Sequence, residues 1–494
     1  MANGISIGGL GSGLDTNAII TQLLRLERIP IDRIETKKAF EQSKITALSK
    51  LKGLVSDLQK KADALSKRSS FLAFSVTPSE DGVASFTASG SAQAGSHSLS
   101  VTKLAEIDRW AFDGVSDPAV DLAGAEGQGL SFDVDGTNYT ITLQQDTSSL
   151  EDIASEINEL AGEDVKASIV NTGTEDAPSH KLVLSSTQSG ESFRIANIAS
   201  TVAGLTIDGQ APDVDGAAQS ANNLTVGSNA VAVIDGLTVE RETNEFTDVI
   251  AGVTLTAQSA DPDKTIQFSV EANKTAIRAK LDEFVTAYNE VIKYINQQNT
   301  YNEDAGPSGP LFGDALLRTV RGNLGQALFD VDLDTVQNDA EGYSTLGLVG
   351  IETQNDGTLQ IDAAVFDDKF EQNLDLLADL FIDVDGFDNG EAEPDTPGYF
   401  DDLSADSGLA ATLSRAIDRL FKTQAGPNDT VLKGVFDART ETFNANIKLF
   451  NDQIARKERH IELFEQNLIQ RFSALEQLIG GLQAQGASLQ AALS

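Results

Sequence analysis

The stretch IKLFNDQIARKERHIELFEQNLIQRFSALEQLIGGLQAQGASL, residues 447–489, has an apolar residue at every seventh position. A strict seven-residue repeat without proline predicts a long helix that supercoils in a left-handed sense around its partners. The positions three residues further on are only about half apolar and include Lys457, Arg471 and Gln485. This indicates a seam shared with other helices, rather than a self-sufficient coil or one helix buried in a globular core. The candidate coiled-coil and assembly residues are Ile447, Ile454, Ile461, Phe464, Leu468, Phe472, Leu475, Leu482 and Leu489.

The amino-terminal end predicts helices that fold back on this stripe. The stretch DTNAIITQLLRLERI, from Asp15, has helical apolar spacing, and one of its first three residues is expected to cap the helix. Pro30 is expected to interrupt it, with a second helix following whose seam is broken early by Lys37, Glu41 and Lys44. The expected apolar faces are Ile19, Ile20, Leu23, Leu24 and Leu26 or Ile29 in the first helix, and Ile34, Leu48, Leu51, Val55, Leu58, Ala62 and Leu65 in the second.

Charge is unevenly distributed along the chain. The 494 residues carry a formal net charge of −39, and the sequence pI is near 4.2. Residues 1–68 have a net charge of +5 and residues 433–494 a net charge of zero, so residues 69–432 carry −44. Nucleic-acid binding needs clustered Lys and Arg, and the acidic surplus argues against it. The sequence predicts two near-neutral helical ends and an acidic middle that faces water.

The acidic middle is predicted to be mainly β-structure. Residues 130–143, LSFDVDGTNYTITL, alternate apolar and polar side chains on both sides of Asp135-Gly136, which is typical of a β-hairpin. The same dipeptide recurs as Asp235-Gly236 within AVAVIDGLTVE. Two more strands are expected at VKASIV and HKLVLSS. Hydrophobic residues make up 40% of the chain, enough for the cores that such sheets need.

A short amphipathic helix is predicted at 148–160, SSLEDIASEINEL. Ser148 and Glu151 stand at capping-box spacing at its start. Its inward residues are expected to be Leu150, Ile153, Ile157 and Leu160.

Other segments have weaker signals. The stretch 204–229 is rich in Gly, Ala, Asn, Asp and Ser and is expected to link two β-rich parts. Helical periodicity returns in 275–298, 361–381 and 409–423. The loop 383–401 is acidic and rich in Pro and Gly, and we expect it to be exposed.

Composition excludes several kinds of site. The absence of cysteine excludes disulfides, cysteine zinc sites and thiol nucleophiles, and the wide separation of His97, His180 and His460 argues against a histidine metal site. No run approaches the roughly 18 apolar residues of a membrane span. The opening residues lack the basic-then-apolar pattern of a Sec signal. On these grounds alone the chain is expected to be soluble, unexported, and without metal or cofactor.

No motif predicts catalysis. GLGSGLD (9–15) follows no predicted strand and lacks the G-K-[ST] of a phosphate-binding loop. Asp383 opens a segment that begins like a calcium loop, but the EF-hand register would place Phe387, Asp388 and Pro394 where an oxygen ligand, a glycine and a glutamate are needed. No G-x-S-x-G nucleophile elbow and no H-E-x-x-H helix is predicted. The sequence therefore predicts a protein that is not an enzyme.

Five segments, in order along the chain, carry a family resemblance. The opening ISIGGLGSGLDTNAIITQLLRLERIPIDRIE is the most specific, through Gly11, Ser12, Gly13, Leu14, Asp15, Ile20, Leu23, Glu27 and Pro30. It is followed by GSHSLSVTKLA, by NEFTDVIAGVTLTA, by FVTAYNEVIKYIN with GPLFGDALLRTVRGNL and YSTLGLVGIETQNDGTLQID, and by the closing IARKERHIELFEQNLIQRFSALEQLI. Together they resemble the flagellar hook-associated protein 2 family, the capping proteins of bacterial flagellar filaments. Residues 108–225 resemble the variable head of such proteins only loosely.

The resemblance implies an α+β multidomain fold, in which helices from both termini form a coiled-coil stem and antiparallel β-rich head domains lie between them. The implied divisions are 1–70, a leader and helical stem; 71–107, the start of the body; 108–225, a variable β-rich head domain; 226–273, a second β-rich head domain with part of 75–107; 274–432, a mixed helical body; and 433–494, the coiled-coil stem.

The resemblance also implies a function. Members form a ring-shaped homo-oligomer at the filament tip, retain exported flagellin and promote its polymerisation; some also bind mucin or host surfaces. They leave the cell through the flagellar type III export apparatus without a cleaved signal, and we expect a dedicated export chaperone. This places the protein outside the cell, revising the expectation from composition. No membrane insertion and no nucleic-acid partner are implied. We further hypothesise that Lys457, Arg471 and Gln485 keep the stem packing reversible.

Two other functional classes stay open at this point. A secreted adhesin would use the β-rich head alone, and a secreted enzyme would need a site that the sequence does not show. Another flagellar axial protein, such as a hook–filament junction protein or a flagellin-like protein, is the nearest alternative. The GLGSGLD opening and the order of the segments disfavour it.

Overall fold

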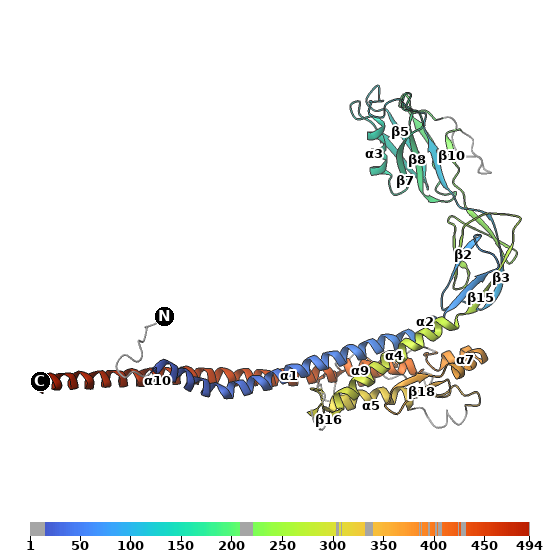
Figure 1. Ribbon diagram of the computed structural model, residues 1–494. Coiled ribbons are helices and arrows are strands. Elements are labelled where there is room, and N and C mark those ends of the chain that lie inside the picture. The colour runs from blue at the N-terminus through green and yellow to red at the C-terminus, as the bar shows by residue number, and fades with distance from the viewer. Residues whose placement is uncertain are drawn as a thin grey trace. The chain divides into compact units, whose positions relative to one another are not determined.

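The computed structural model describes residues 15–207, 221–302, 306–307, 309–330, 339–384, 386, 388–393, 396–400, 403, 408–422, 424–425 and 431–493. The chain divides into two compact units, Met1–Phe71 with Arg278–Ser494, called the helical unit, and Leu72–Ile277, called the β unit. Helices near both ends of the chain and antiparallel sheets between them confirm the α+β architecture expected from the sequence (Figure 1).

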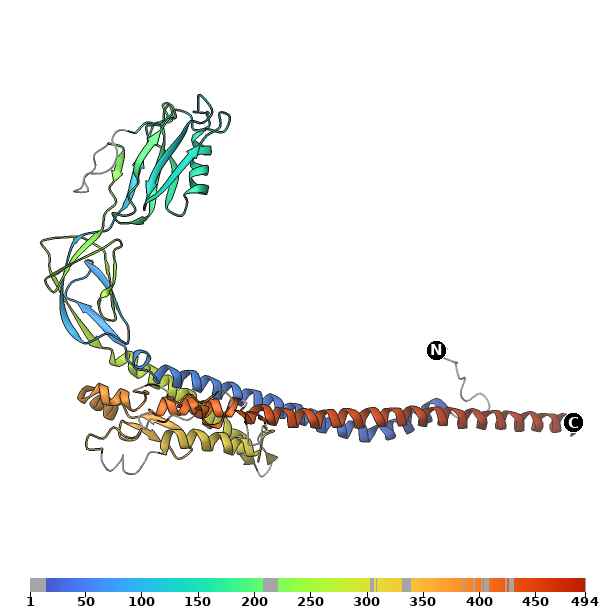
Figure 2. The same cartoon turned by 180° about the vertical axis from the view of Figure 1, so that it is seen from behind.

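Two long helices dominate the helical unit. Helix α1 (Thr16–Leu65) and helix α10 (Val435–Leu493) lie side by side, and α10 continues past the first residue of α1 (Figures 1 and 2). The other helices with residues in this unit are α2 (Arg68–Phe71), α4 (Lys274–Asn299), α5 (Ala315–Phe329), α7 (Ala363–Gln372), α8 (Leu374–Asp379), a 3-10 helix (Pro397–Phe400) and α9 (Leu409–Phe421). Short antiparallel strand pairs lie between them: β16 (Tyr301–Asn302) with β17 (Gly306–Pro307), β18 (Ile351–Thr353) with β19 (Leu359–Ile361), and β20 (Gln424–Ala425) with β21 (Val431–Leu432).

Helix α1 is continuous through Pro30, so the expectation of two helices separated by this proline is wrong. Proline removes one backbone hydrogen bond and tends to bend a helix. Ile20 and Ile31, on either side of it, are both buried, and α1 packs along α10. This packing between distant parts of the chain compensates for the lost hydrogen bond. The local pattern around Pro30 does not contain that information.

The expected apolar face of the second half of α1 is confirmed. Each of its last six seam residues is at most 2% exposed: Leu48, Leu51, Val55, Leu58, Ala62 and Leu65. Helix α9 covers part of this face, where Gln59 Nε2 donates to Asp418 Oδ1 at 2.9 Å. Helix α5 was not predicted, and the predicted helix 361–381 is divided at Asn373, whose extended backbone ends α7 and whose side chain caps α8.

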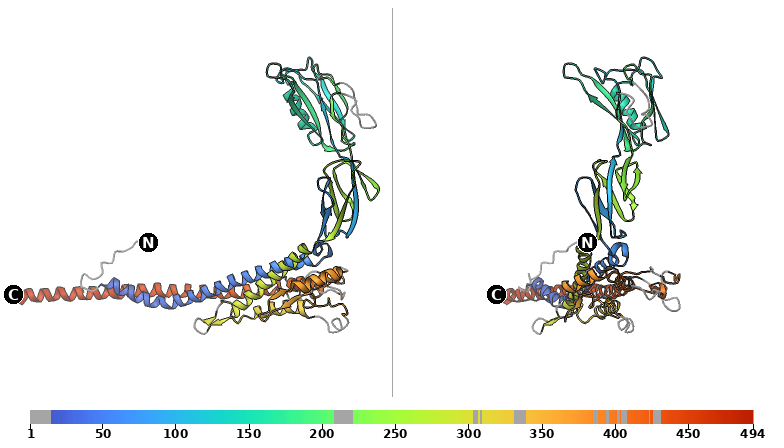
Figure 3. Two further views of the ribbon diagram at one scale, coloured as in Figure 1. Left: turned by 45° about the vertical axis from the view of Figure 1, so that its right-hand side comes forward. Right: turned by 90° about the vertical axis from the view of Figure 1, so that its right-hand side faces the viewer.

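The β unit contains two lobes, each with its own hydrophobic core (Figure 3). The flanking lobe has a five-stranded antiparallel sheet in the order β1-β15-β3-β11-β12 and a three-stranded sheet in the order β13-β14-β2. Its buried centre includes Leu99, Phe246 and Phe268. The strands are β1 (Phe74–Pro78), β2 (Ala84–Ala88), β3 (Gly95–Lys103), β11 (Ala230–Ile234), β12 (Leu237–Arg241), β13 (Glu245–Ile250), β14 (Val253–Ala257) and β15 (Ile266–Ala272).

The inserted lobe interrupts the flanking lobe between β3 and β11. Its described residues form one sheet in the order β10-β4-β8-β7, another in the order β6-β5-β9, and helix α3. Trp110, Phe112 and Phe132 are fully buried in its core. Its elements are β4 (Ile107–Ala111), β5 (Gly129–Val134), β6 (Thr137–Thr142), α3 (Leu150–Leu160), β7 (Val165–Asn171), β8 (His180–Ser189), β9 (Ala196–Ser200) and β10 (Asn223–Thr225).

Both hairpins predicted from Asp-Gly are confirmed. Strands β5 and β6 meet at Asp135-Gly136, and β11 and β12 meet at Asp235-Gly236. All four turn residues have positive φ, at 46° and 75° in the first turn and 51° and 82° in the second. Two consecutive positive φ values define the type I′ turn, whose twist matches that of the flanking strands.

The cap of α3 lies one residue later than predicted. Ser149 is the N-cap and forms a capping box with Asp152, so Ser148 and Glu151 are not the capping pair. The hydroxyl of Ser148 is instead buried and accepts hydrogen bonds from Leu122 N (3.1 Å) and Ala123 N (3.0 Å). Leu150, Ile153 and Ile157 face the core as expected, whereas Leu160, at the last residue of the helix, is exposed.

Asp108 joins the two ends of the inserted lobe. Its side chain is fully buried, and Oδ2 accepts hydrogen bonds from Trp110 Nε1 (2.7 Å) and Ile195 N (2.9 Å). Its other oxygen accepts from Gly227 N (2.9 Å) and Asn223 Nδ2 (3.2 Å). Four donors satisfy the buried carboxylate, as a buried charge requires.

Two loop predictions need correction. The stretch 204–229 is not only a linker, because β10 lies within it and pairs with β4; residues 208–220 lie outside the described part of the chain. In the loop 383–401, which is described only in part, Asp383 is largely buried and pairs with Arg415 Nη1 at 3.2 Å. No group of residues that could hold a metal ion is found among the described residues.

Candidate functional site

The candidate site is the pair of helices α1 and α10, called the stem. We divide it into an inner half, residues 41–65 with 435–446, and an outer half, residues 16–40 with 447–493. In the inner half, α1 is covered by α9 as well as by α10. In the outer half α10 continues past the start of α1, with no other described element beside it, as Figures 1 and 2 show from opposite sides.

The predicted heptad residues differ in burial along α10. Ile461 and Leu468 are 6% and 9% exposed. Leu475, Leu482 and Leu489 are 41%, 58% and 66% exposed, so the apolar stripe continues into an uncovered part of the helix. Four other residues of the set are half-buried, namely Ile447, Ile454, Phe464 and Phe472. The assembly role of this set stays a prediction.

The polar residues predicted within the seam, Lys457, Arg471 and Gln485, are all exposed. Polar side chains between apolar residues weaken a helix–helix contact compared with an unbroken apolar stripe. Their proposed effect on reversibility stays a hypothesis.

The family signature at the amino terminus lies only partly within the described residues. Gly11, Ser12, Gly13 and Leu14 lie outside them, and Asp15 is the N-cap of α1, accepting from Ala18 N at 2.9 Å. The remaining signature residues are Ile20, which is buried, Leu23 and Glu27, which are exposed, and Pro30, which is half-buried inside α1.

A polar cluster at the boundary between the two halves was missed by sequence reasoning. Glu41 of α1, only 8% exposed, accepts from Lys44 Nζ at 2.7 Å and from Asn446 Nδ2 at 3.1 Å. Burial alone would raise the pKa of Glu41, but these hydrogen bonds and the charge of Lys44 outweigh it, so the pKa is lowered. The sequence contained one indication of this cluster, because Glu41 lies on the predicted apolar seam and a buried charge requires a partner.

The cluster extends to α5 through the buried ring of Phe443. Lys44 Nζ lies 5.4 Å from the ring centroid, and Arg439 Cζ lies 4.7 Å from it. Arg439 also donates to Asp314 Oδ2 from Nε (2.9 Å) and Nη2 (2.7 Å), while Asp314 Oδ1 caps α5 at Leu316 N (3.0 Å). Aromatic rings attract cations that lie over their faces. The cluster therefore ties α1, α5 and α10 together.

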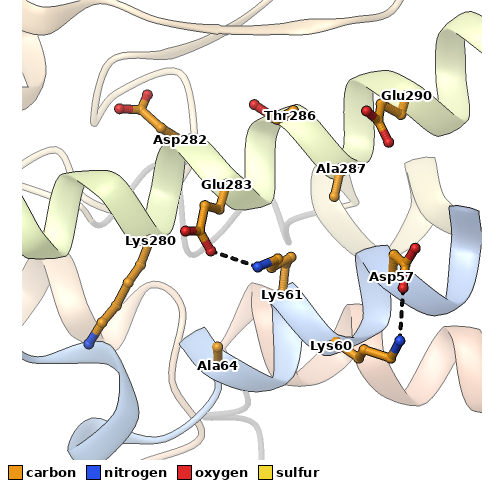
Figure 4. Close-up of a pocket in the computed structure, with 10 residues that line it drawn as sticks. All are labelled: Asp57, Lys60, Lys61, Ala64, Lys280, Asp282, Glu283, Thr286, Ala287 and Glu290. Atoms are coloured by element: carbon orange, nitrogen blue, oxygen red, sulfur yellow. Dashed lines mark hydrogen bonds and ion pairs between the residues drawn. The ribbon is translucent and has the colours of Figure 1, made fainter.

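A groove of about 610 Å³ lies between α1 and α4 (Figure 4). An ion pair at 2.7 Å between Lys61 and Glu283 crosses it, and Ala64 and Ala287 contribute small apolar side chains. Lys280 Nζ points away from the other labelled groups and donates to Ser70 O at 2.6 Å; burial lowers the pKa of Lys280. The Lys61–Glu283 pair and the small alanine side chains are those of a helix–helix contact.

The described residues contain no cluster of His, Cys, Asp or Glu that could hold a metal ion. In the same part of the chain no helix combines the length and hydrophobicity that crossing a bilayer requires. The described stem presents an apolar stripe, a polar cluster within it, and an exposed continuation of the stripe.

Comparisons with known proteins agree with this description. Residues 227–484 match the family model of the flagellar hook-associated protein 2 C-terminus, and residues 12–108 match that of its N-terminus. The A-type flagellar hook-associated protein 2 of Pseudomonas aeruginosa is 26% identical over 518 residues, covering 100% of this chain and 98% of the relative. Flagellar hook-associated protein 2 of Escherichia coli K12 is 28% identical over 373 residues, covering 73% and 76%.

One solved structure is similar over most of the chain. It is that of the D1–D2–D3 domains of the flagellar cap protein from Escherichia coli, with a TM-score of 0.61 and 22% sequence identity. The similarity covers 81% of this chain and 99% of that one. It supports the fold described above, with its helical unit and its two β-rich lobes.

Proposed function

Because the chain belongs to the flagellar hook-associated protein 2 family, we propose that it is the structural cap at the tip of a bacterial flagellar filament. There it retains exported flagellin and promotes the polymerisation of flagellin into the filament. The observation that carries this function is that the family matches include the helices at both ends of the chain, which pair to form the stem.

The proposed cap is a ring-shaped homo-oligomer whose outer stem halves pack against neighbouring copies and the filament tip. Leu475, Leu482 and Leu489 support this, since they continue a heptad stripe that no other part of the described chain covers. Burying an exposed leucine side chain is worth roughly 1.5–3 kcal/mol, so a neighbouring helix gains by covering them. The polar cluster at Glu41 would then mark where packing within the chain gives way to packing between chains.

The proposed mechanism is steric templating and not catalysis. A gap between one stem and the filament admits one flagellin, whose incorporation shifts the cap to its next position. The stems must exchange between nearly equivalent contacts. Lys457, Arg471 and Gln485, exposed at intervals along the stripe, are suited to contacts that form and break.

The proposed location is the outside of the cell, at the filament tip. Export would occur through the flagellar type III apparatus, in an unfolded state, with the help of a dedicated chaperone. The lack of cysteine fits this route, because no disulfide has to form or be avoided after export.

In-frame deletion of the gene tests the function directly. We expect cells that still make flagellin but release it unpolymerised into the medium, and whose filaments are absent or very short. Complementation with the intact gene should restore filaments. Filaments of normal length on the deletion strain, seen by electron microscopy, would contradict the proposal.

A further inference from the structure

The two lobes of the β unit are connected by two chain crossings, one before β4 and one before β11. The crossings pair with each other at Glu106 and Ser228, with Glu106 N donating to Ser228 O at 2.9 Å and Ser228 N to Glu106 O at 3.1 Å. Two adjacent strands alone leave lobes free to bend about them, and relative motion is the default for domains joined in this way.

A third contact lies beside the crossings. The loop Ser189–Arg194 of the inserted lobe, between β8 and β9, reaches the turn between β12 and β13 of the flanking lobe. Ser189 Oγ donates to the backbone oxygen of Glu242 at 2.7 Å, and Ser192 Oγ donates to the Glu242 carboxylate. We propose that this loop is a clasp that holds the two lobes in one orientation, so that the β unit moves as one rigid body.

The clasp also contacts both crossings. Gly190 N donates to Glu106 O at 3.3 Å, and Glu191 N donates to Asn229 Oδ1 at 2.8 Å. Arg194, whose side chain is 15% exposed, donates from Nε to Gly227 O at 2.6 Å and from Nη2 to Glu191 Oε1 at 2.9 Å. The loop therefore bonds to both crossings and to the flanking lobe.

The fit at Gly190 is close enough to require glycine. Its φ is +114°, a conformation that other residues rarely adopt. A Cβ at this position would lie 2.8 Å from the Cβ of Glu242. An alanine at position 190 would therefore push the loop away from the flanking lobe. This steric effect does not depend on the hydrogen bonds of Ser189 and Ser192.

Individually the hydrogen bonds of exposed groups are weak, and their effect here is geometric. The two crossings and the clasp are separate attachments, and a third attachment removes the bending that two leave free. Asn229 extends the clasp, because its Nδ2 donates to Glu240 Oε1 of β12 at 2.7 Å while its Oδ1 accepts from the loop.

The test measures the distance between the lobes in the full chain. Ser168→Cys on β7 and Thr238→Cys on β12 are exposed positions, one on each lobe, and the chain has no cysteine of its own to compete for a spin label. Labelled protein is diluted with unlabelled protein, so that pulsed electron paramagnetic resonance reports distances within one chain. We expect one narrow distance distribution for this labelled parent.

Two variants break the clasp by different routes. We expect Gly190→Ala, which inserts a side chain, and Glu242→Ala, which removes the carboxylate, each to widen the distribution about twofold. Glu242→Gln keeps an acceptor for Ser192 and should restore the parental width. Glu245→Ala is the matched control, because this exposed carboxylate lies outside the clasp.

Circular dichroism melting of the same samples should show that the variants remain folded. A broad distribution in the labelled parent would overturn the proposal. A parental width in both Gly190→Ala and Glu242→Ala would also overturn it, because the crossings alone would then fix the lobes.

Discussion

The inner and outer halves of the stem have similar apolar stripes but different surroundings. In the inner half, α1 buries Leu51 and Leu58 completely beneath α9 and α10. In the outer half, Leu482 and Leu489 stand on the same heptad seam as the buried Ile461 and Leu468, yet more than half of each side chain is exposed. A heptad repeat predicts that one face of a helix packs against another helix. It does not indicate whether that partner helix belongs to the same chain.

The polar cluster of Glu41, Lys44 and Asn446 lies where these two halves meet. A buried charge inside a seam costs desolvation and is retained where it fixes how helices pair. We therefore expect the inner half to stabilise the folded chain, and we propose that the outer half serves assembly. Each prediction below tests one side of that division.

The largest expected effect is on assembly. Replacing Leu475, Leu482 and Leu489 together by alanine should abolish filament formation and release flagellin into the medium, because the uncovered stripe is lost. The unfolding free energy of the isolated chain should change by less than about 0.5 kcal/mol for each substitution, as at exposed sites generally. Normal filaments on cells that carry this variant would show that the stripe is not an assembly surface.

The next effect is on folding. Leu51→Ala in the inner half should lower the free energy of unfolding by roughly 2–5 kcal/mol, because it leaves a cavity in a fully covered site. Denaturant titration measures this, with Leu482→Ala as the matched substitution in the outer half. Equal losses for the two variants would remove the distinction between the halves.

A smaller effect is expected at the boundary. Glu41→Ala should destabilise the chain by about 1–3 kcal/mol, because Lys44 and Asn446 lose a buried acceptor. The folded-state pKa of Glu41 is lowered, so its stabilisation is present at neutral pH and is lost as pH falls through the folded-state pKa, below 4.5. Unfolding measured between neutral pH and pH values below that pKa should therefore show a weaker pH dependence for Glu41→Gln. Identical pH profiles for this variant and the parent would contradict this account.

The smallest effect is expected at the start of α1. Asp15→Ala removes the side-chain cap at Ala18 N and should cost about 1 kcal/mol or less of local stability, since this end is exposed. Hydrogen exchange should accelerate in the first turn of α1 and stay unchanged around Leu51. Faster exchange along the whole helix would show that the two halves unfold together.

Much of the fold could be predicted from local pattern. The long helix α10, the buried seam from Leu48 to Leu65 and the two Asp-Gly turns depend on spacing or on one dipeptide, and the structure contains all of them. The prediction that Pro30 ends the first helix was wrong for a physical reason. Proline removes one backbone hydrogen bond, and the packing of α1 against α10 compensates for that loss.

The parts of the site that were not predicted depend on contacts between distant residues. Asp314 and Arg439 are 125 residues apart, and no spacing in the sequence indicates that they pair. The Ser192–Glu242 contact of the clasp likewise joins two exposed loops of ordinary composition. Burial of the heptad residues also could not be predicted in detail, because the pattern is the same from Ile461 to Leu489 while the coverage by α1 is not.

The buried carboxylate of Asp108 has a consequence for protein engineering. Because it binds Asn223 and Gly227, the first strand of the inserted lobe and the return of the chain are joined inside that lobe. The hydrogen bonds of Asp108 therefore hold the two ends of the inserted lobe together within the lobe itself. Suitable positions for replacing the whole lobe lie just outside these bonds, at Glu106 and Ser228, where the two crossings pair. A foreign domain with closely spaced termini could be spliced between these residues, whereas a cut inside them would leave a buried charge without its donors.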